Sequence, residues 1–308
     1  MEIFLQIILL FVGFAMLIKG ADWFVDGSSG IATKFKIPQL VIGLTIVAMG
    51  TSAPEAAVSI AAALKGNADI TIGNIVGSNI LNILIILGIS ALITPLAVAK
   101  STIKVEIPFM IVVTLLLLGM GYNGTISLLE GIILLLVFLV YLGYLFLLAK
   151  NDKNKDEENI KDVSIWKALI WTVVGLVLIV YGSNVTVDAA TKIAQIVGLS
   201  ERFIGLTIVA LGTSLPELFT SVSAARKGNA DIAIGNIVGS TIFNIQFVIG
   251  VSATIVPVPF ANGFRFDTII AIAAAVLLLL CSLKDKKLKS WSGILMLLSY
   301  AAYFVAIW

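Results

Sequence analysis

Histidine is absent from this sequence of 308 residues, and cysteine occurs only once, at Cys281. Without histidine the chain lacks the commonest general base, proton shuttle and transition-metal ligand. A single cysteine excludes an internal disulfide and a cysteine metal cluster. Charged residues are also scarce, at 12% of the chain, whereas 59% of the residues are apolar. Oxygen atoms are therefore the main polar ligands that this chain can offer, and we expect no enzyme activity and no bound cofactor.

Apolar runs of about 18 residues or more recur along nearly the whole sequence, which is typical of a polytopic membrane protein. We predict an all-α polytopic membrane protein with ten transmembrane helices. Residues 151–163 are mixed in charge sign and lack apolar periodicity, so we predict a linker between two five-helix halves, 1–150 and 164–308. The predicted helices cover 3–20, 38–64, 70–94, 104–121, 126–149, 165–183, 201–225, 232–256, 266–283 and 290–307.

The two halves contain the same sequence motif. The first copy, residues 42–91, has GTSAPE at 50–55 and GNIVGSNILN at 73–82. The second copy, residues 204–253, has GTSLPE and GNIVGSTIFN at a constant offset of 162 residues. Because five is an odd number of helices, the second half must begin on the opposite side of the membrane from the first. The sequence thus predicts two inverted five-helix repeats, an architecture associated with alternating-access transporters.

The basic residues predict the orientation in the membrane. Four of them are predicted on the side of the membrane that holds the amino terminus, and the other Lys and Arg residues are predicted on the opposite side. By the positive-inside rule, both termini are extracellular and the linker is cytoplasmic in a multi-pass protein of the cell membrane. The four exceptions are Lys65, Lys192, Arg202 and Arg265.

Each copy places a carboxylate, hydroxyl groups and a proline inside an apolar segment. Thr51 and Glu55 are four residues apart and share a helix face, while Pro54 cannot donate to the carbonyl of Gly50. A carbonyl freed in this way needs another partner inside a bilayer. A charge buried in a bilayer costs about 2.5 to 3.5 kcal/mol, so an ionisable residue at such a position indicates a functional site. The second copy repeats the construction with Thr213, Pro216 and Glu217.

The next helix of each copy also carries polar side chains four residues apart, together with a small-xxx-small seam of glycines that allows close helix approach. Two carboxylates with neutral oxygens suit hard cations such as Ca²⁺ or Na⁺. An empty site would carry two negative charges, so we expect the carrier to cross only when loaded, which is coupled exchange. The polar pairs are Ser78 with Asn82 and Ser240 with Asn244, and the glycines are Gly73, Gly77, Gly235 and Gly239.

The doubled motif resembles the α-repeats of the cation/Ca²⁺ antiporter superfamily, and in particular its prokaryotic sodium/calcium exchangers. The resemblance implies a Ca²⁺ site made by Glu55 and Glu217 with the carbonyls of Thr51 and Thr213. It also implies that the first and sixth helices slide against the rest of the protein to switch access. The implied Na⁺ sites use Ser52, Ser78, Ser214, Ser240 and the carbonyls of Ala48 and Ala210, with Asn82 and Asn244 at the centre.

Two positions bear on the driving ion. Potassium-dependent relatives have Asp where this chain has Asn244, which disfavours a K⁺ requirement. Proton-driven relatives tend to have glutamate where this chain has Gly77 and Gly239, which favours Na⁺. The expected function is exchange of Na⁺ for Ca²⁺, with three Na⁺ entering per Ca²⁺ expelled; the alternatives are a K⁺-dependent exchanger, an H⁺/Ca²⁺ antiporter and a cation channel. We expect Na⁺, Ca²⁺ and the lipid bilayer as partners, no nucleic acid, and a monomer.

Other acids have simpler interpretations. Asp69 and Asp231 follow turn residues, so we predict N-caps. Asp22, Asp26 and Asp188 are predicted at the solvated ends of the first and sixth helices. Glu106, Glu130 and Asp267 are predicted at the membrane interface. Acidification is expected to inhibit transport, because two nearby carboxylates that take up protons no longer attract a cation.

Overall fold

The computed structural model describes residues 2–66, 68–151, 164–198 and 210–307. This part of the chain is helical apart from four two-residue strands. Eight of its helices are long and apolar enough to cross a membrane, and a bent pair of helices between Gln39 and Leu64 makes up to nine. The all-helical prediction is confirmed. The predicted helix 201–225 and the linker 151–163 lie partly or wholly outside the described residues, so the count of ten stays a prediction.

The helices of the first half are α1 (Glu2–Phe35), α2 (Gln39–Ile42), α3 (Ala48–Thr51), α4 (Ala53–Leu64), α5 (Asp69–Leu81), α6 (Leu87–Ile93), α7 (Ile107–Met120) and α8 (Leu128–Asn151). Those of the second half are α9 (Ile165–Ile196), α11 (Ala210–Thr213), α12 (Leu215–Arg226), α13 (Ala230–Phe243), α14 (Gly250–Ile255), α15 (Asn262–Leu283) and α16 (Ser290–Ile307). Short π-helical segments, η1 (Gly43–Val47), η2 (Asn82–Ile86), η3 (Thr102–Glu106) and η6 (Asn244–Ile249), continue several of them, and η4 (Gly121–Asn123) is a 3₁₀ turn. The strands are β1 (Leu96–Ala97), β2 (Thr125–Ile126), β3 (Val258–Pro259) and β4 (Lys287–Leu288).

Two predicted helices were too short. The first was predicted to end at residue 20 and the sixth at residue 183, but α1 continues to Phe35 and α9 to Ile196. The polar residues in their second halves were interpreted as helix ends. Instead, these residues contact other helices or line a cavity, so the helices continue beyond their apolar parts. Tertiary contacts here outweigh the hydropathy signal.

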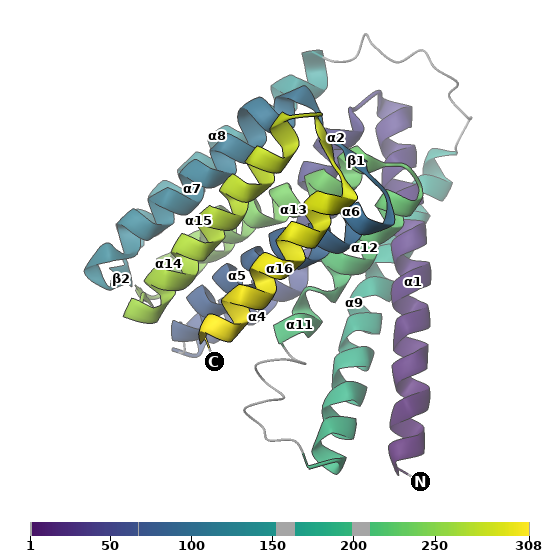
Figure 1. Ribbon diagram of the computed structural model, residues 1–308, viewed down its shortest axis with the longest axis horizontal. Coiled ribbons are helices and arrows are strands. Elements are labelled where there is room, and N and C mark those ends of the chain that lie inside the picture. Colours follow the sequence, from purple (N-terminus) through teal and green to yellow (C-terminus); the bar gives the residue numbers. More distant parts are fainter. Residues whose placement is uncertain (1, 67, 152–163, 199–209, 308) are drawn as a thin grey trace.

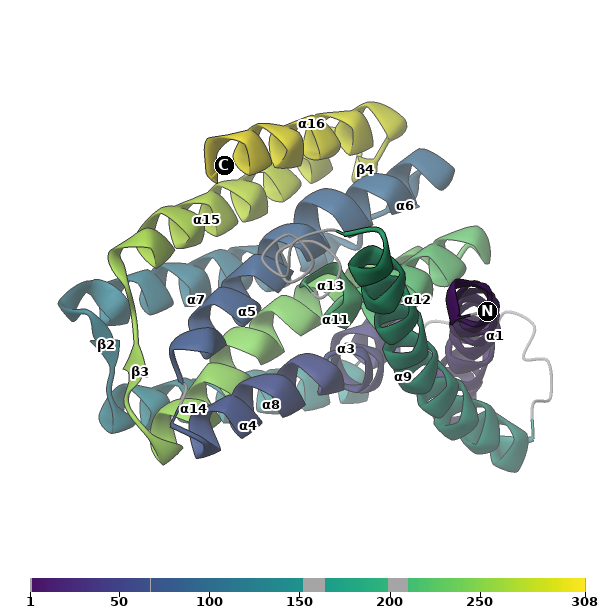
Figure 2. The same ribbon diagram turned by 90° about the horizontal axis from the view of Figure 1, so that it is seen from below.

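The helices α1 and α9 lie side by side at one edge of the molecule, beside the bundle made by the others (Figures 1 and 2). Their contact surface is lined by glycines spaced seven residues apart. A Cβ atom added to Gly20 would lie 2.9 Å from the carbonyl oxygen of Gly175, and one added to Gly13 would lie 3.0 Å from that of Gly182. The two backbones therefore approach closely, as small residues permit in membranes.

Inside the bundle, α5 with α6 and α13 with α14 form the buried centre, whereas α1, α8 and α16 are mostly exposed. Gly235 and Gly239 of α13 contact the backbone of η1, since added Cβ atoms would lie 3.0 Å from the Cα of Gly43 and 2.7 Å from the carbonyl of Leu44. The predicted glycine seam is thus confirmed in the second repeat. In the first repeat, no atom of the described residues lies within 4 Å of a Cβ added to Gly77.

The two halves exchange equivalent contacts. Leu96 of β1 pairs with Leu288 of β4, and Ile126 of β2 pairs with Val258 of β3. Adding 162 to one residue of the first pair and subtracting it from the other gives the second pair. The tight turns between helices also correspond, because Gly66 and Gly228 both adopt φ of +78°, a conformation that favours glycine.

Candidate functional site

The site begins at two breaks in the helices of the repeats. α3 ends at Thr51 and α4 begins at Ala53, with a bend of 50° between the two halves of the span. Pro54 stands in the first turn of α4, as expected for a residue that cannot donate to the preceding turn. The break between α11 and α12 repeats this arrangement around Ser214, with Pro216 in the first turn. The predicted opening of both helices at the proline is confirmed.

Glu55 and Glu217 follow these breaks, and both side chains are fully buried. Each receives a hydrogen bond from the serine at the break of the other repeat. Ser52 Oγ donates to Glu217 Oε1 at 2.7 Å, and Ser214 Oγ donates to Glu55 Oε1 at 3.4 Å. These crossed bonds place the two carboxylates at the buried interface between the two repeats. The sequence predicted that the two acids meet inside the protein, and the geometry agrees.

Two further asparagines fix the broken helices, and sequence reasoning had assigned them no role. The Thr51 hydroxyl donates to Asn236 Oδ1 at 2.9 Å, and Asn236 Nδ2 donates to Ser221 Oγ at 2.9 Å. In the first repeat Asn74 Nδ2 donates to Ser59 Oγ at the same distance. Both asparagines stand at the same offset in the duplicated motif, which is the signal that could have identified them.

Asn82 and Asn244 are fully buried, each at the first position of a π-helical segment. Such segments are frequent at functional sites. Asn244 Nδ2 donates to Asn79 Oδ1 at 3.2 Å, while Asn244 Oδ1 and both polar atoms of the Asn82 side chain have no partner among the residues that the structure describes. The amides thus belong to the same buried polar layer as the helix breaks.

The remaining predicted ligands occupy the surrounding positions. Ser240 Oγ donates to the carbonyl of Ala48 at 3.3 Å, which links α13 to α3. Ser78 is buried on α5, and Thr213 ends α11 at the break. The main chain of Ala210 begins α11, but residues 199–209 before it lie outside the described part of the chain.

Around the helix breaks, several buried side-chain oxygen atoms lack a hydrogen-bond donor among the described residues. Within the described part of the chain, Oε2 of Glu55, Oε2 of Glu217 and the amide oxygens of Asn82 and Asn244 have no donor. Within the described residues, neither glutamate forms an ion pair and no group of three His, Cys, Asp or Glu side chains gathers. Leaving a buried acceptor unsatisfied costs about 1 to 3 kcal/mol, and more for a charged group. An arrangement of this kind is stabilised by a hard cation, which oxygen atoms coordinate.

Comparisons with known proteins agree with this chemistry. A family model described as sodium/calcium exchanger protein matches residues 5–147 and 167–308. The chain belongs to the sodium/calcium exchanger family. It is 42% identical to the putative antiporter CaxA of Alkalimonas amylolytica over 96% of each chain. It is 32% identical to the sodium/calcium exchanger MaX1 of Methanosarcina acetivorans over 97% of each chain.

A solved structure of the sodium-calcium exchanger NCX_Mj superposes on this chain with a TM-score of 0.87 at 33% identity. The alignment covers 99% of this chain and all of that one. The recognised resemblance to the prokaryotic exchangers of the cation/Ca²⁺ antiporter superfamily is therefore confirmed. The chain is an antiporter-family membrane protein and not a member of an enzyme family.

In this exchanger-family chain a cavity of about 600 Å³ opens beside the helix breaks, between α4, α9 and α11. Pro54 and Thr213 line its wall on the side of the breaks, and Ser183, Asn184 and Asp188 of α9 line the other. Ser183 Oγ donates to the carbonyl of Gly212 at 2.7 Å, which ties α9 to α11. The cavity therefore lies against both helix breaks.

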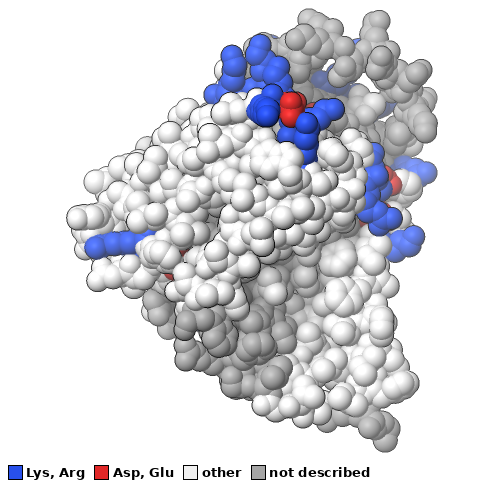
Figure 3. Space-filling view, in the orientation of Figure 1, with Lys and Arg blue, Asp and Glu red and all other residues white. Residues whose placement is uncertain are grey.

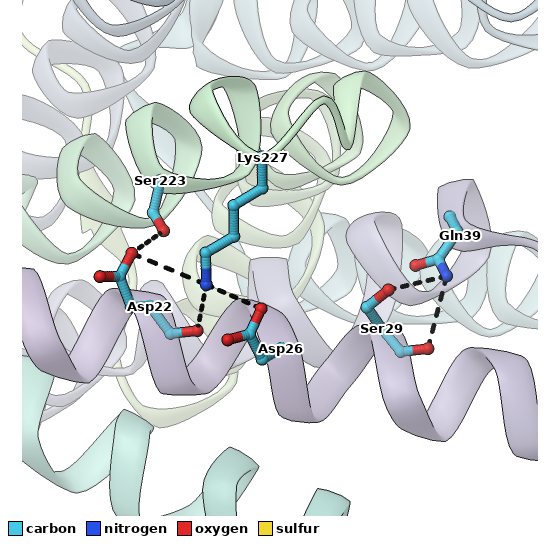
Figure 4. A network of polar contacts seen from close by, with 6 residues as sticks. All are labelled: Asp22, Asp26, Ser29, Gln39, Ser223 and Lys227. Carbon is cyan, nitrogen blue, oxygen red and sulfur yellow. Dashed lines mark hydrogen bonds and ion pairs between the residues drawn. The ribbon is translucent and has the colours of Figure 1, made fainter. Parts of the chain in front are cut away.

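Several acids outside the site differ from expectation. Asp22 and Asp26 lie within α1 and not at its end, because both are paired with Lys227 (Figure 4). Asp188 likewise lies within α9, on the cavity. The N-cap positions predicted for Asp69 and Asp231 belong to Ala68 and Asn229.

The three acids that were predicted at the interface differ from one another. Glu106 is fully buried and accepts a hydrogen bond from Tyr144. It stands near the start of the span Thr102–Asn123, and its place at the membrane interface stays a prediction. Glu130 accepts bonds from the main chain and hydroxyl of Ser127, which closes the start of α8. The Tyr303 hydroxyl donates to Asp267 at 2.9 Å.

Proposed function

We propose that this chain exchanges Na⁺ for Ca²⁺ across the cell membrane by alternating access. The observation that carries the proposal is the pair of buried carboxylates held by crossed serine bonds, with unsatisfied oxygens beside them. Two ionised carboxylates are neutralised by one Ca²⁺ or by Na⁺ ions. Without a cation, the paired charges oppose passage through an occluded state, so transport in one direction requires a load in the other.

In this proposal the two carboxylates and the carbonyls of the helix breaks bind Ca²⁺, and the hydroxyl and amide oxygens around them bind Na⁺. The family membership and the close structural match to NCX_Mj support this assignment. No cofactor is needed beyond the transported ions. The proposed ligands are Glu55, Glu217, Thr51, Thr213, Ser52, Ser214, Ser78, Ser240, Asn82, Asn244, Ala48 and Ala210.

The proposed architecture is two inverted repeats of five helices, 1–150 and 164–308, joined by a cytoplasmic linker. The exchanged strand pairs support it, because a two-fold relation between the halves generates one pair from the other. Orientation follows from the charges. On the face shown in Figure 3, Lys and Arg side chains gather mainly at the end opposite the N-terminus, above a broad surface that is mostly uncharged. By the positive-inside rule this basic end is cytoplasmic and the termini are extracellular.

The test uses purified protein in vesicles loaded with Na⁺ and diluted into Na⁺-free medium that contains Ca²⁺. We expect rapid Ca²⁺ entry with internal Na⁺ and none with internal K⁺ or Li⁺. Ca²⁺ entry in the absence of any internal Na⁺ would indicate a channel. Entry that requires K⁺ together with Na⁺, or that follows a proton gradient, would replace the proposal with a K⁺-dependent or H⁺-driven exchanger.

A further inference from the structure

Lys227, at the end of α12, is held by the second half of α1 (Figure 4). Its Nζ lies 2.7 Å from Asp26 Oδ1 and 3.7 Å from Asp22 Oδ1, and it donates to the main-chain oxygen of Asp22 at 2.7 Å. Ser223 Oγ donates to Asp22 Oδ1 at 2.6 Å. These contacts attach the outer helix α1 to the helix that carries Glu217.

The offset of 162 residues identifies the equivalent positions in the other repeat. Asp26 corresponds to Asp188 on α9, and Lys227 corresponds to Lys65 at the end of α4. Among the described residues, neither Asp188 nor Lys65 forms an ion pair, and both are exposed. Asp188 instead lines the 600 Å³ cavity. The same pair of residue types is therefore joined in one repeat and separated in the other.

We propose that the two pairs are alternating latches that position α1 and α9 against the helices bearing the glutamates. The Asp26–Lys227 pair holds the cytoplasmic side closed while the extracellular side is open. The Asp188–Lys65 pair forms when the extracellular side closes, as the first pair separates. This inference rests on the proposed function and adds residues outside the ion site that determine which side is open.

The latches are unequal. The first includes Asp22 and Ser223, whereas the equivalent positions are Asn184 and Ala61. The α1–α12 latch thus has a second carboxylate and an extra hydroxyl donor that the α9–α4 latch lacks. Opposite charges at close range favour contact, so the unequal charge biases the protein toward the state with a closed cytoplasmic side.

The test compares Lys227→Met with its repeat-related control Lys65→Met in vesicles of known orientation. For Lys227→Met we expect the half-saturating Ca²⁺ concentration to rise on the extracellular side and to fall on the cytoplasmic side, by up to about fivefold, the range of partly exposed ion pairs. Lys65→Met should change both values in the opposite direction. Exchanging the charges, with Asp26→Lys and Lys227→Asp together, should move both values back toward wild type, but only in part, because Asp22 then repels the carboxylate at position 227.

Equal changes on both sides, or no change, would overturn the latch inference while leaving exchange itself intact. Failure of the wild-type protein to exchange would instead overturn the proposed function.

A second measurement does not depend on transport. In a Cys281→Ser background, a short bifunctional thiol reagent should link Lys65→Cys to Asp188→Cys and thereby protect cysteines placed in the cavity between α4, α9 and α11 from modification. If this pair cannot be linked under any ionic condition, the second latch does not form.

Discussion

Each carboxylate of the candidate site is oriented by the opposite repeat. Ser52 bonds to Glu217 and Ser214 bonds to Glu55, although each serine stands three residues before the glutamate of its own repeat. A glutamate therefore cannot move with its own helix alone without losing its serine partner. This coupling makes the site sensitive to the relative position of the two broken helices.

At the glutamates, Glu55→Gln and Glu217→Gln each keep the side-chain shape but remove one charge. A unit charge about 4 Å away contributes about 4 kcal/mol per elementary charge of the bound ion, so we expect Ca²⁺ binding to weaken by at least about a thousandfold and Na⁺-dependent Ca²⁺ uptake to disappear. Vesicle uptake measures transport, and size-exclusion chromatography confirms folding. Glu106→Gln is the control, because Glu106 is equally buried but bonds to Tyr144 away from the helix breaks. Full uptake by either of the first two variants would remove that glutamate from the site.

Substitution of Asn236 tests whether the hydrogen bonds that hold the broken helices matter for ion binding. Asn236 accepts a hydrogen bond from Thr51 and donates one to Ser221, and these two bonds join α13 to α3 and to α12. Asn236→Ala removes both bonds. A buried hydrogen bond lost from one side costs about 1 to 3 kcal/mol. We expect a lower melting temperature in detergent and a reduced affinity for Ca²⁺. Unchanged values for both quantities would show that the two bonds contribute little.

At the scale of helices, α1 and α9 form a pair joined by glycines. Gly20→Leu would place a large side chain where a Cβ atom already lies 2.9 Å from the Gly175 carbonyl and the Ile179 nitrogen. The two helices must then separate, so we expect a strongly reduced transport rate together with lower thermal stability. Gly143→Ala in α8 is the matched control, because its Cβ has no neighbour within 4 Å in the described part of the chain. Normal transport by Gly20→Leu would show that close contact is not required.

The duplicated motif allowed the helix breaks, the two glutamates, Asn82 and Asn244 to be identified from sequence, because identical polar residues recur inside apolar segments. The lengths of α1 and α9 could not be predicted in the same way. Their second halves contain Asp22, Asp26 and Asp188, which are typical of a helix end when the neighbours are unknown. Only the contact with Lys227 and the cavity explain why the helices continue. The burial of Glu106 likewise depends on Tyr144, which lies far along the sequence.

For the whole molecule, the exchanged strand pairs suggest how the two halves stay registered. Leu96 of the first half pairs with Leu288 of the second. At the equivalent positions, Ile126 of the first half pairs with Val258 of the second. All four residues are buried. Because these contacts lie outside the α1–α9 pair, they are expected to persist while that pair moves. We therefore expect the mobile part of the transport cycle to be this pair of helices and the latches that hold it.

The energy that transport needs under assumed gradients predicts a stoichiometry. Expelling Ca²⁺ against a ten-thousandfold gradient costs about 5.5 kcal/mol, and moving two charges against 100 mV adds about 4.6 kcal/mol. Each Na⁺ that enters down a tenfold gradient and the same potential releases about 3.7 kcal/mol. Two ions release too little and three release enough, so we expect three Na⁺ per Ca²⁺ and one net charge moved per cycle.

A K⁺ diffusion potential set with valinomycin measures that charge. Vesicles loaded with Na⁺ should take up Ca²⁺ faster when their interior is made positive, because three Na⁺ leave for each Ca²⁺ that enters and carry one net positive charge outward. An interior-negative potential should slow the same uptake. A rate independent of voltage would mean that two Na⁺ exchange for one Ca²⁺, and the gradients assumed above would then be too small to drive Ca²⁺ out.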